Sequence, residues 1–165
     1  LAQGAQPIIS YNYGAGNSNR VRRAYRLLLI CSVCYAMLFC LLIQLFPGVF
    51  AAIFTSNAEL LAFTKPMLRI YTLALGLFGI QIACQMTFTA LGNAKASIIV
   101  AVMRKFILLL PLIYMMPHLY TADLTKAVFM AEPVADVLAV AFTGVLFFFE
   151  FRKALRAMPK SEKKS

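Results

Sequence analysis

Charge is scarce in this sequence, and that scarcity excludes most classes of soluble protein. Charged residues make up 13% of the chain, with six acidic and 16 basic residues, whereas a soluble domain carries roughly a quarter charged residues. Hydrophobic residues reach 62%, and the mean hydropathy is +0.80. The net charge of +10 does not indicate a nucleic-acid partner, because the basic residues are distributed over gaps between apolar stretches.

Residues that catalyse reactions or bind metals are also few. The only histidine, His118, falls in a predicted outer loop, and the four cysteines, at positions 31, 34, 40 and 84, all fall in predicted membrane spans. The Cys31-x-x-Cys34 pair has no second CxxC and no nearby histidine, so it favours apolar packing over a zinc or redox site. With no Ser/His/Asp set and no phosphate loop, we expect no enzyme, no metal and no cofactor.

What the sequence does contain is four long apolar stretches, at residues 27–46, 67–91, 98–116 and 127–149. Each is close to the ~20 residues that a helix needs to cross about 30 Å of hydrocarbon. Residues 1–10 are mildly apolar and are typical of the end of a preceding helix. The sequence therefore predicts an all-α integral membrane protein, a polytopic helical bundle with four complete transmembrane helices and the end of a fifth.

The basic residues lie mainly in alternate gaps between these stretches. They are Arg20, Arg22, Arg23 and Arg26 before the first span, Lys95, Arg104 and Lys105 around the turn after the second, and Arg152, Lys153, Arg156, Lys160, Lys163 and Lys164 after the fourth. The positive-inside rule then predicts a cytoplasmic loop and helix start at 11–26 and a basic cytoplasmic tail at 150–165, in a cell membrane. Anchoring to lipid headgroups is the expected role of Arg104 and Lys105.

Glycine and proline predict where the helices end or bend. Residues 11–19 are rich in turn formers, and Gly16 permits a positive φ. Gly92 suits the C-terminal cap of the second span, and Pro66 suits the first turn of that helix. Pro111 lies in the middle of the third span, where it removes a backbone hydrogen bond and favours a kink.

The fourth span carries two acidic residues, Glu132 and Asp136. Asp136 is the tenth residue of the predicted span and would lie about 15 Å deep, where a carboxylate costs about 2.5–3.5 kcal/mol. Glu132 lies one turn away on the same face, and Pro133 leaves the carbonyl of Phe129 without its donor. These groups predict a proton or Na⁺ coupling site. The alternative is that Asp136 only packs against a hydroxyl or an arginine of a neighbouring helix.

The second span carries polar and aromatic residues close to one stripe. They are Gln81, Gln85, Phe78, Phe88 and Thr89. One interpretation is the wall of a cavity for an organic solute, with aromatic faces that attract cations. The other is hydrogen bonding between helices, worth about 0.6 kcal/mol on average.

Three motifs in this order resemble those of the multidrug and toxic compound extrusion (MATE) transporters. The first is residues 4–16, Gly-Ala-Gln-Pro-Ile-Ile-Ser-Tyr-Asn-Tyr-Gly-Ala-Gly, which resemble the family's cytoplasmic loop motif. Its motif positions here are Gly4, Gln6, Pro7, Tyr11, Asn12, Gly14 and Ala15. The second is residues 88–97 with Arg104, similar to a turn between two helices, and the third is Glu132-Pro-Val-Ala-Asp136, similar to the final helix.

The resemblance implies a twelve-helix antiporter of two six-helix lobes, which exports organic, often cationic, compounds in exchange for H⁺ or Na⁺. This chain would be the C-terminal lobe without its first helix, in contact with the lipid bilayer, small organic cations and an N-terminal lobe that is absent here. Because the chain begins with Leu1, we expect a fragment. Thr89 stands where many relatives carry Gln, and span two has Gln81 and Gln85 where some carry an acidic ion ligand.

Two other functions remain open from the sequence. A lipid-linked saccharide flippase of the same superfamily would need a cationic cavity, and the spans offer little central positive charge. A non-transporting membrane scaffold would tolerate apolar replacement of its intramembrane polar residues. A secondary transporter with alternating access around a midplane cavity agrees best with the kinked helices and the midplane acid.

Overall fold

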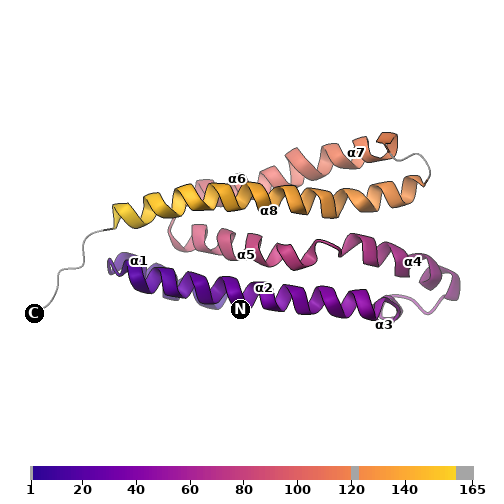
Figure 1. The fold of residues 1–165 in the computed structure, drawn as a ribbon, viewed down its shortest axis with the longest axis horizontal. Coiled ribbons are helices and arrows are strands. Elements are labelled where there is room, and N and C mark those ends of the chain that lie inside the picture. Colours follow the sequence, from indigo (N-terminus) through magenta and orange to yellow (C-terminus); the bar gives the residue numbers. More distant parts are fainter. Residues whose placement is uncertain (1, 120–122, 159–165) are drawn as a thin grey trace, which may run out of the picture.

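The computed structural model describes residues 2–119 and 123–158, and the regular structure of these residues is entirely helical (Figure 1). The elements are α1 (Ala2–Gly14), α2 (Ser18–Leu45), α3 (Pro47–Ala52), α4 (Ala58–Tyr71), α5 (Leu75–Ala90), α6 (Ala94–Val102), the π-helix η1 (Met103–Leu109), α7 (Leu110–Leu119) and α8 (Leu124–Ala157). Among the described residues, three continuous helices are long and apolar enough to cross a membrane, and the bent pair α4–α5 meets the same criteria when it is counted as one span. The prediction of an all-α membrane bundle is confirmed.

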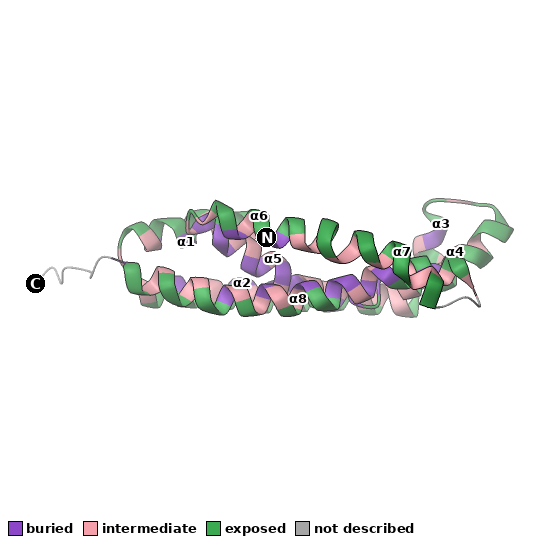
Figure 2. Cartoon of the chain, turned by 90° about the horizontal axis from the view of Figure 1, so that it is seen from above, coloured by how far each residue is buried: buried purple, intermediate pink, exposed green. Residues whose placement is uncertain are grey.

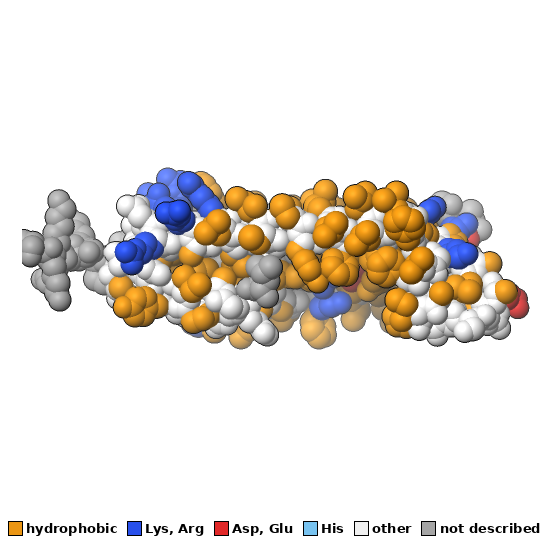
Figure 3. All heavy atoms as spheres, turned by 90° about the horizontal axis from the view of Figure 1, so that it is seen from below, with side chains coloured by type: hydrophobic (Ala, Val, Ile, Leu, Met, Phe, Trp, Pro, Cys, Tyr) orange, Lys and Arg blue, Asp and Glu red, His pale blue; other side chains and the backbone are white. Residues whose placement is uncertain are grey.

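The long helices run along one axis, so the bundle has two distinct ends (Figure 1). We call the end that holds the α1–α2 turn, the α5–α6 turn and the last turns of α8 the basic end. The opposite end, with α3, the start of α4 and the end of α7, is the far end. Lys and Arg side chains gather at the two ends, with a small group at mid-length among hydrophobic side chains (Figure 3).

Two turns at the basic end have the same construction. In the first, Gly16 has φ +71°, its N–H donates to the carbonyl of Tyr13, and the N–H of Asn17 donates to the carbonyl of Asn12. In the second, Gly92 has φ +73°, its N–H donates to the carbonyl of Thr89, and the N–H of Asn93 donates to the carbonyl of Phe88. These are Schellman caps, which need only three residues outside the helices. The segment 11–26, predicted as a loop and helix start, is therefore helical except for residues 15–17.

An aromatic cluster packs α2, α5 and α8 together near the basic end. The ring of Phe147 on α8 lies 4.5 Å from Tyr25, 4.8 Å from Phe151 and 5.3 Å from Phe88, measured between centroids. Phe88 is fully buried. Buried residues concentrate along the facing sides of these helices (Figure 2). Spacings of this size are typical of favourable aromatic pairs, so this part of the bundle has a well-packed core.

Farther along, α2 and α5 approach closely at Gly79. A Cβ built on Gly79 would meet the backbone of α2, 2.6 Å from the carbonyl oxygen of Ser32 and 2.9 Å from the Cα of Val33. Only glycine leaves room for the two backbones to lie this close, as is common where membrane helices cross.

The predicted span 67–91 is not one straight helix but a broken one. The chain is helical from Ala58 and bends by 51° between α4 and α5, at residues 72–74. Pro66, expected in the first turn, lies inside α4. The break contains neither Gly nor Pro, and side chains of α2 bind carbonyls in it and just before it. Gln44 donates to the carbonyl of Arg69 at 2.8 Å, and the Cys40 thiol donates to the carbonyl of Thr72 at 3.4 Å.

The predicted span 98–116 is part of a longer helix, residues 94–119, with a π-helical middle. In η1 the backbone bonds span five residues, as when the N–H of Leu110 donates to the carbonyl of Lys105. Pro111 follows directly and has no N–H to offer, which fits a widened turn just before it. Arg104 is the eleventh residue of this helix, so it lies far from the basic end where headgroup anchoring was expected.

The last helix, α8, extends beyond the predicted span 127–149 at both ends. Its N-cap is Asp123, whose Oδ1 accepts the N–H of Lys126 at 3.1 Å. At the other end it continues to Ala157, so the first part of the predicted tail 150–165 is helical, while residues 159–165 lie outside the described residues. Glu150 of α8 accepts a 2.8 Å bond from Asn93, which ties the α5–α6 turn to this extension.

Candidate functional site

The two carboxylates predicted on the last helix converge on one arginine. Arg104 of η1 places its Nε and Nη2 at 2.7 Å from Oδ1 of Asp136, and its Nη2 at 3.0 Å from Oε1 of Glu132. The three side chains are nearly enclosed, with exposed fractions of 14% for Arg104, 12% for Glu132 and 8% for Asp136. We call Arg104, Glu132 and Asp136 the charged cluster.

Two further side chains border the charged cluster. The ring of Phe78 on α5 lies against the guanidinium face, with Cζ of Arg104 4.5 Å from the ring centroid. Nζ of Lys105 lies 3.8 Å from Oε1 of Glu132, and its side chain is 54% exposed. The planar cation of Arg104 is thus held at its edge by carboxylate oxygens and on its face by an aromatic ring.

Helix geometry explains why one arginine serves both acids. Glu132 and Asp136 are four residues apart on α8 and therefore share a face, where two like charges would repel each other. Arg104 lies between them and neutralises one charge, and Lys105 stands beside the other. A buried charge without a partner is costly, so the pairing is a condition for these acids to be ionised inside the bundle.

Polar groups continue from the charged cluster toward the basic end. Helices α5 and α8 run in the same direction. Phe78 of α5 lies at the level of the charged cluster, and ten residues later Phe88 contacts Phe147 of α8 near the basic end. Gln81 lies between these levels on α5 and is 2% exposed. Its Oε1, like the hydroxyl of the fully buried Thr143 on α8, has no hydrogen-bond partner among the described residues.

The other predicted cavity residues lie closer to the basic end. Phe88 is part of the aromatic cluster, so in this structure its ring packs against helices rather than lining an open wall. Gln85 is half-buried, and its backbone carbonyl accepts the hydroxyl of Thr89 at 3.1 Å. Thr89 is exposed and also lies 3.5 Å from the hydroxyl of Ser97 across the turn. The structure therefore brings Phe78 to the charged cluster and leaves these three residues elsewhere.

The loop-motif residues follow α1 from mid-length of the bundle to the turn at the basic end (Figure 1). Gly4, Gln6, Pro7, Tyr11, Asn12 and Gly14 belong to α1, and Ala15 opens the turn. Asn12 is buried and its Nδ2 donates to the carbonyl of Ile8 at 2.8 Å. Nearby, the hydroxyl of Ser10 donates to the carbonyl of Ala90 at 2.8 Å. The bond from Ser10 joins α1 to the end of α5, whereas the bond from Asn12 lies within α1.

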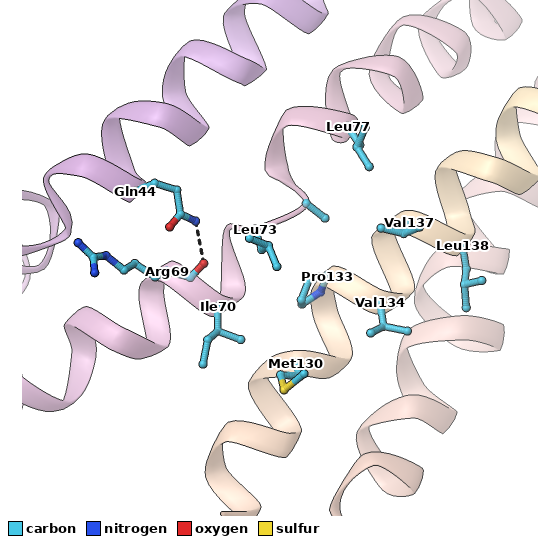
Figure 4. Close-up of a pocket in the computed structure, with 11 residues that line it drawn as sticks. Gln44, Arg69, Ile70, Leu73, Leu77, Met130, Pro133, Val134, Val137 and Leu138 are labelled. Carbon is cyan, nitrogen blue, oxygen red and sulfur yellow. Dashed lines mark hydrogen bonds between the residues drawn. The ribbon is translucent and has the colours of Figure 1, made fainter. Parts of the chain in front are cut away.

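A separate apolar cavity of about 560 Å³ lies between the α4–α5 break and α8. Figure 4 shows Met130, Pro133, Val134 and Val137 of α8 opposite Ile70, Leu73 and Leu77. The hydrogen bond from Gln44 to the carbonyl of Arg69 lies at its edge (Figure 4). Its lining is apolar apart from these two residues, so the cavity suits hydrocarbon rather than an ion.

The sequence analysis left open an arginine of a neighbouring helix as the partner of Asp136, but it assigned Arg104 to headgroup anchoring and did not identify it as that partner. The sequence did contain information on the depth of Arg104. Ten residues of helix separate it from Ala94, which places it about 15 Å from the turn at Gly92 and near the level of the two acids. No group of three His, Cys, Asp or Glu side chains suited to a metal ion occurs in the part of the chain that the structure describes.

Comparison with known proteins shows which structures share this fold. Three solved structures superpose well on this chain. An inward-facing multidrug resistance MATE family transporter of the MOP superfamily matches with TM-score 0.86 and 18% identity, over 94% of this chain and 36% of its own. A mutant of the Vibrio cholerae MATE transporter VcmN matches with TM-score 0.82 and 21% identity, over 92% and 34%. The MATE multidrug transporter DinF-BH, solved as a complex, matches with TM-score 0.82 and 30% identity, over 94% and 34%.

This chain thus spans about a third of the length of these transporters. No curated protein matches its sequence significantly. The MatE family model matches residues 1–115, which include Arg104 but not the two acids of α8. Since that match covers well over half of the sequence, the chain belongs to the MatE family of membrane transporters.

Proposed function

We propose that this chain is part of a secondary active multidrug efflux transporter, which exports organic, mainly cationic, compounds in exchange for H⁺ or Na⁺. The observation that carries the proposal is the buried carboxylate pair, Asp136 and Glu132, in the middle of a helical membrane bundle. Ionisable residues inside membrane proteins commonly mark ion pathways and proton relays. The resemblance of the fold to multidrug MATE transporters supports the same function.

The chemistry of exchange explains why carboxylates suit this role. A carboxylate binds a proton, a sodium ion or an organic cation through the same oxygens, so only one of them occupies the site at a time. Transport follows when the occupied and empty forms prefer different orientations of the two lobes. In the proposal, the missing lobe closes the pathway opposite the charged cluster, and alternating access comes from rocking of the lobes.

We propose further that the basic end faces the cytoplasm of a cell whose plasma or inner membrane holds the protein. The support is the positive-inside rule, since Arg20, Arg22 and Arg23 and the end of α8 meet at the basic end. The apolar cavity beside the α4–α5 break lies at the same level of α8 as the charged cluster, because its lining residues from Met130 to Leu138 bracket both acids.

The interior arginine bears on the flippase alternative. Arg104 supplies positive charge at mid-bundle, which a polyanionic headgroup would need, but its Nε and Nη2 already bind the two acids. The cluster as folded therefore favours cation exchange over anion capture.

Efflux from vesicles tests the proposal. The complete two-lobe protein is reconstituted, an H⁺ or Na⁺ gradient is imposed, and exit of a fluorescent organic cation is followed. We expect Asp136→Asn to reduce gradient-driven exchange by at least about tenfold, because the site then loses a charge that binds the coupling ion. Asp123→Asn is the matched control, since Asp123 is an exposed helix cap. Gradient-driven exchange that survives Asp136→Asn and Glu132→Gln together would exclude this site from coupling.

A further inference from the structure

The charged cluster already contains a bound organic cation, which is the chain's own guanidinium. The edge of Arg104 is bound by Asp136 and Glu132, and its face lies 4.5 Å from the ring of Phe78. These are the contacts that a free planar cation would make with carboxylates and an aromatic wall. Arg104 therefore shows which ligand shape the site accepts.

We propose that Arg104 is a tethered competitor that occupies the coupling site between transport events, and that planar delocalised cations such as amidinium compounds must displace it from Asp136 and Glu132. This inference rests on the proposed function, because it names the substrate chemistry and the regulation of the same site. Arg104 is a positioning residue in this scheme, since it sets the affinity of the site without being transported.

Charge balance explains why displacement is required. The two acids are faced by two cations, Arg104 and Lys105, so an additional cation finds no unpaired negative charge. A ligand that binds there must replace one of them. Lys105 balances the second charge from a half-exposed position, with Nζ 3.8 Å from Oε1 of Glu132, whereas Arg104 holds the hydrogen-bond contacts that a planar ligand would use. Exchange of one guanidinium for one organic cation keeps the buried charge constant.

The backbone at Arg104 is suited to such movement. Arg104 belongs to the π-helical segment η1, whose bonds span five residues, and Pro111 follows it. A return of this segment to α-helical bonding would rotate the residues ahead of it relative to α7, and π-helical turns are frequent at functional sites for such reasons. The side chain can therefore leave the acids by a local change within one helix.

Binding measurements with two probes test the proposal. In the complete transporter in detergent, benzamidinium is titrated calorimetrically against the wild type and Arg104→Gln, with tetraethylammonium as a cation of equal charge that donates no hydrogen bonds. Removal of the competitor should raise benzamidinium affinity by about tenfold or more, because the free site is then always available. Tetraethylammonium affinity should rise much less. Arg152→Gln is the control, since Arg152 lies over Phe148 at 4.9 Å but at the exposed basic end.

A kinetic readout separates competition from simple damage. Arg104→Gln should bind benzamidinium more tightly yet turn over more slowly, because the tethered cation no longer helps to release the ligand. Arg104→Lys, which retains the charge without the planar fork, should give an intermediate affinity and a folded protein. Unchanged or weaker benzamidinium affinity in both variants would overturn the inference. If the wild type neither binds nor exports organic cations, the proposed function itself fails, which is a distinguishable result.

Discussion

The two halves of this bundle are stabilised in different ways. Near the basic end, two Schellman turns and the aromatic cluster around Phe147 fix α1, α2, α5 and α8 by close apolar packing. Toward the middle and the far end, the helices are broken at 72–74 and π-helical at 103–109, and they are joined by directional polar contacts. These contacts include Gln44 to the α4–α5 break and Arg104 to the α8 acids.

In the proposed transport cycle, this difference indicates which half is able to change. Apolar packing of rings tolerates little movement, whereas a few side-chain bonds between separate helices can be exchanged for bonds to an ion or a ligand. The basic half then acts as a fixed platform, and the middle half contains the movable contacts. Substitutions in the basic half are therefore expected to act on stability alone, whereas substitutions of the polar contacts in the middle are expected to act on both stability and transport.

Truncation of the central ring tests the platform most severely. Phe147→Ala should lower the free energy of unfolding by about 3 kcal/mol, because it removes the ring that contacts Tyr25, Phe88 and Phe151 together. Phe148→Ala is the control, since Phe148 is its exposed neighbour. Thermal unfolding in detergent measures both. Equal losses in the two variants would contradict a core centred on Phe147.

A smaller loss is expected where α2 and α5 touch. Gly79→Ala should destabilise the protein by about 1–3 kcal/mol, because the added Cβ meets the backbone of Ser32 and Val33, which cannot rotate away. Gly144→Ala is the matched control, because nothing lies within 4 Å of its added Cβ. The same unfolding assay should show Gly144→Ala as neutral or slightly more stable. A neutral result for Gly79→Ala would show that the two helices can separate at this crossing.

The smallest effect concerns pH at the far end. The N–H and ammonium of Lys126 bind the Asp123 carboxylate and lower its pKa below the ordinary value. Because the folded pKa is lowered, the stabilisation is present above the ordinary carboxyl pKa and is lost as the pH falls through the lowered value. The difference in unfolding temperature between wild type and Asp123→Asn should therefore be small at neutral pH and vanish in acid. A difference in unfolding temperature that grows in acid would contradict a lowered pKa of Asp123.

The sequence predicts the apolar architecture well and the polar contacts poorly, for physical reasons. Run length alone identifies membrane helices, and a glycine before Asn93 identifies a cap, because both depend on local chemistry. The break at 72–74 depends instead on Cys40 and Gln44 of another helix. Likewise, the partner of Asp136 depends on how η1 is rotated against α8, which no single segment specifies.

The pairing of Arg104 with Asp136 is the centre of this account, and a double-mutant cycle tests it most directly. Arg104→Gln, Asp136→Asn and the double variant are compared by thermal unfolding of the complete transporter in detergent. Arg104→Gln should cost about 3–5 kcal/mol, because it leaves the buried Asp136 carboxylate without its partner, and Asp136→Asn should cost less, because Arg104 keeps its contact with Glu132. The double variant should lose about 2 kcal/mol less than the sum of the two. Additive losses would show that the two charges do not meet inside the bundle and would contradict the account.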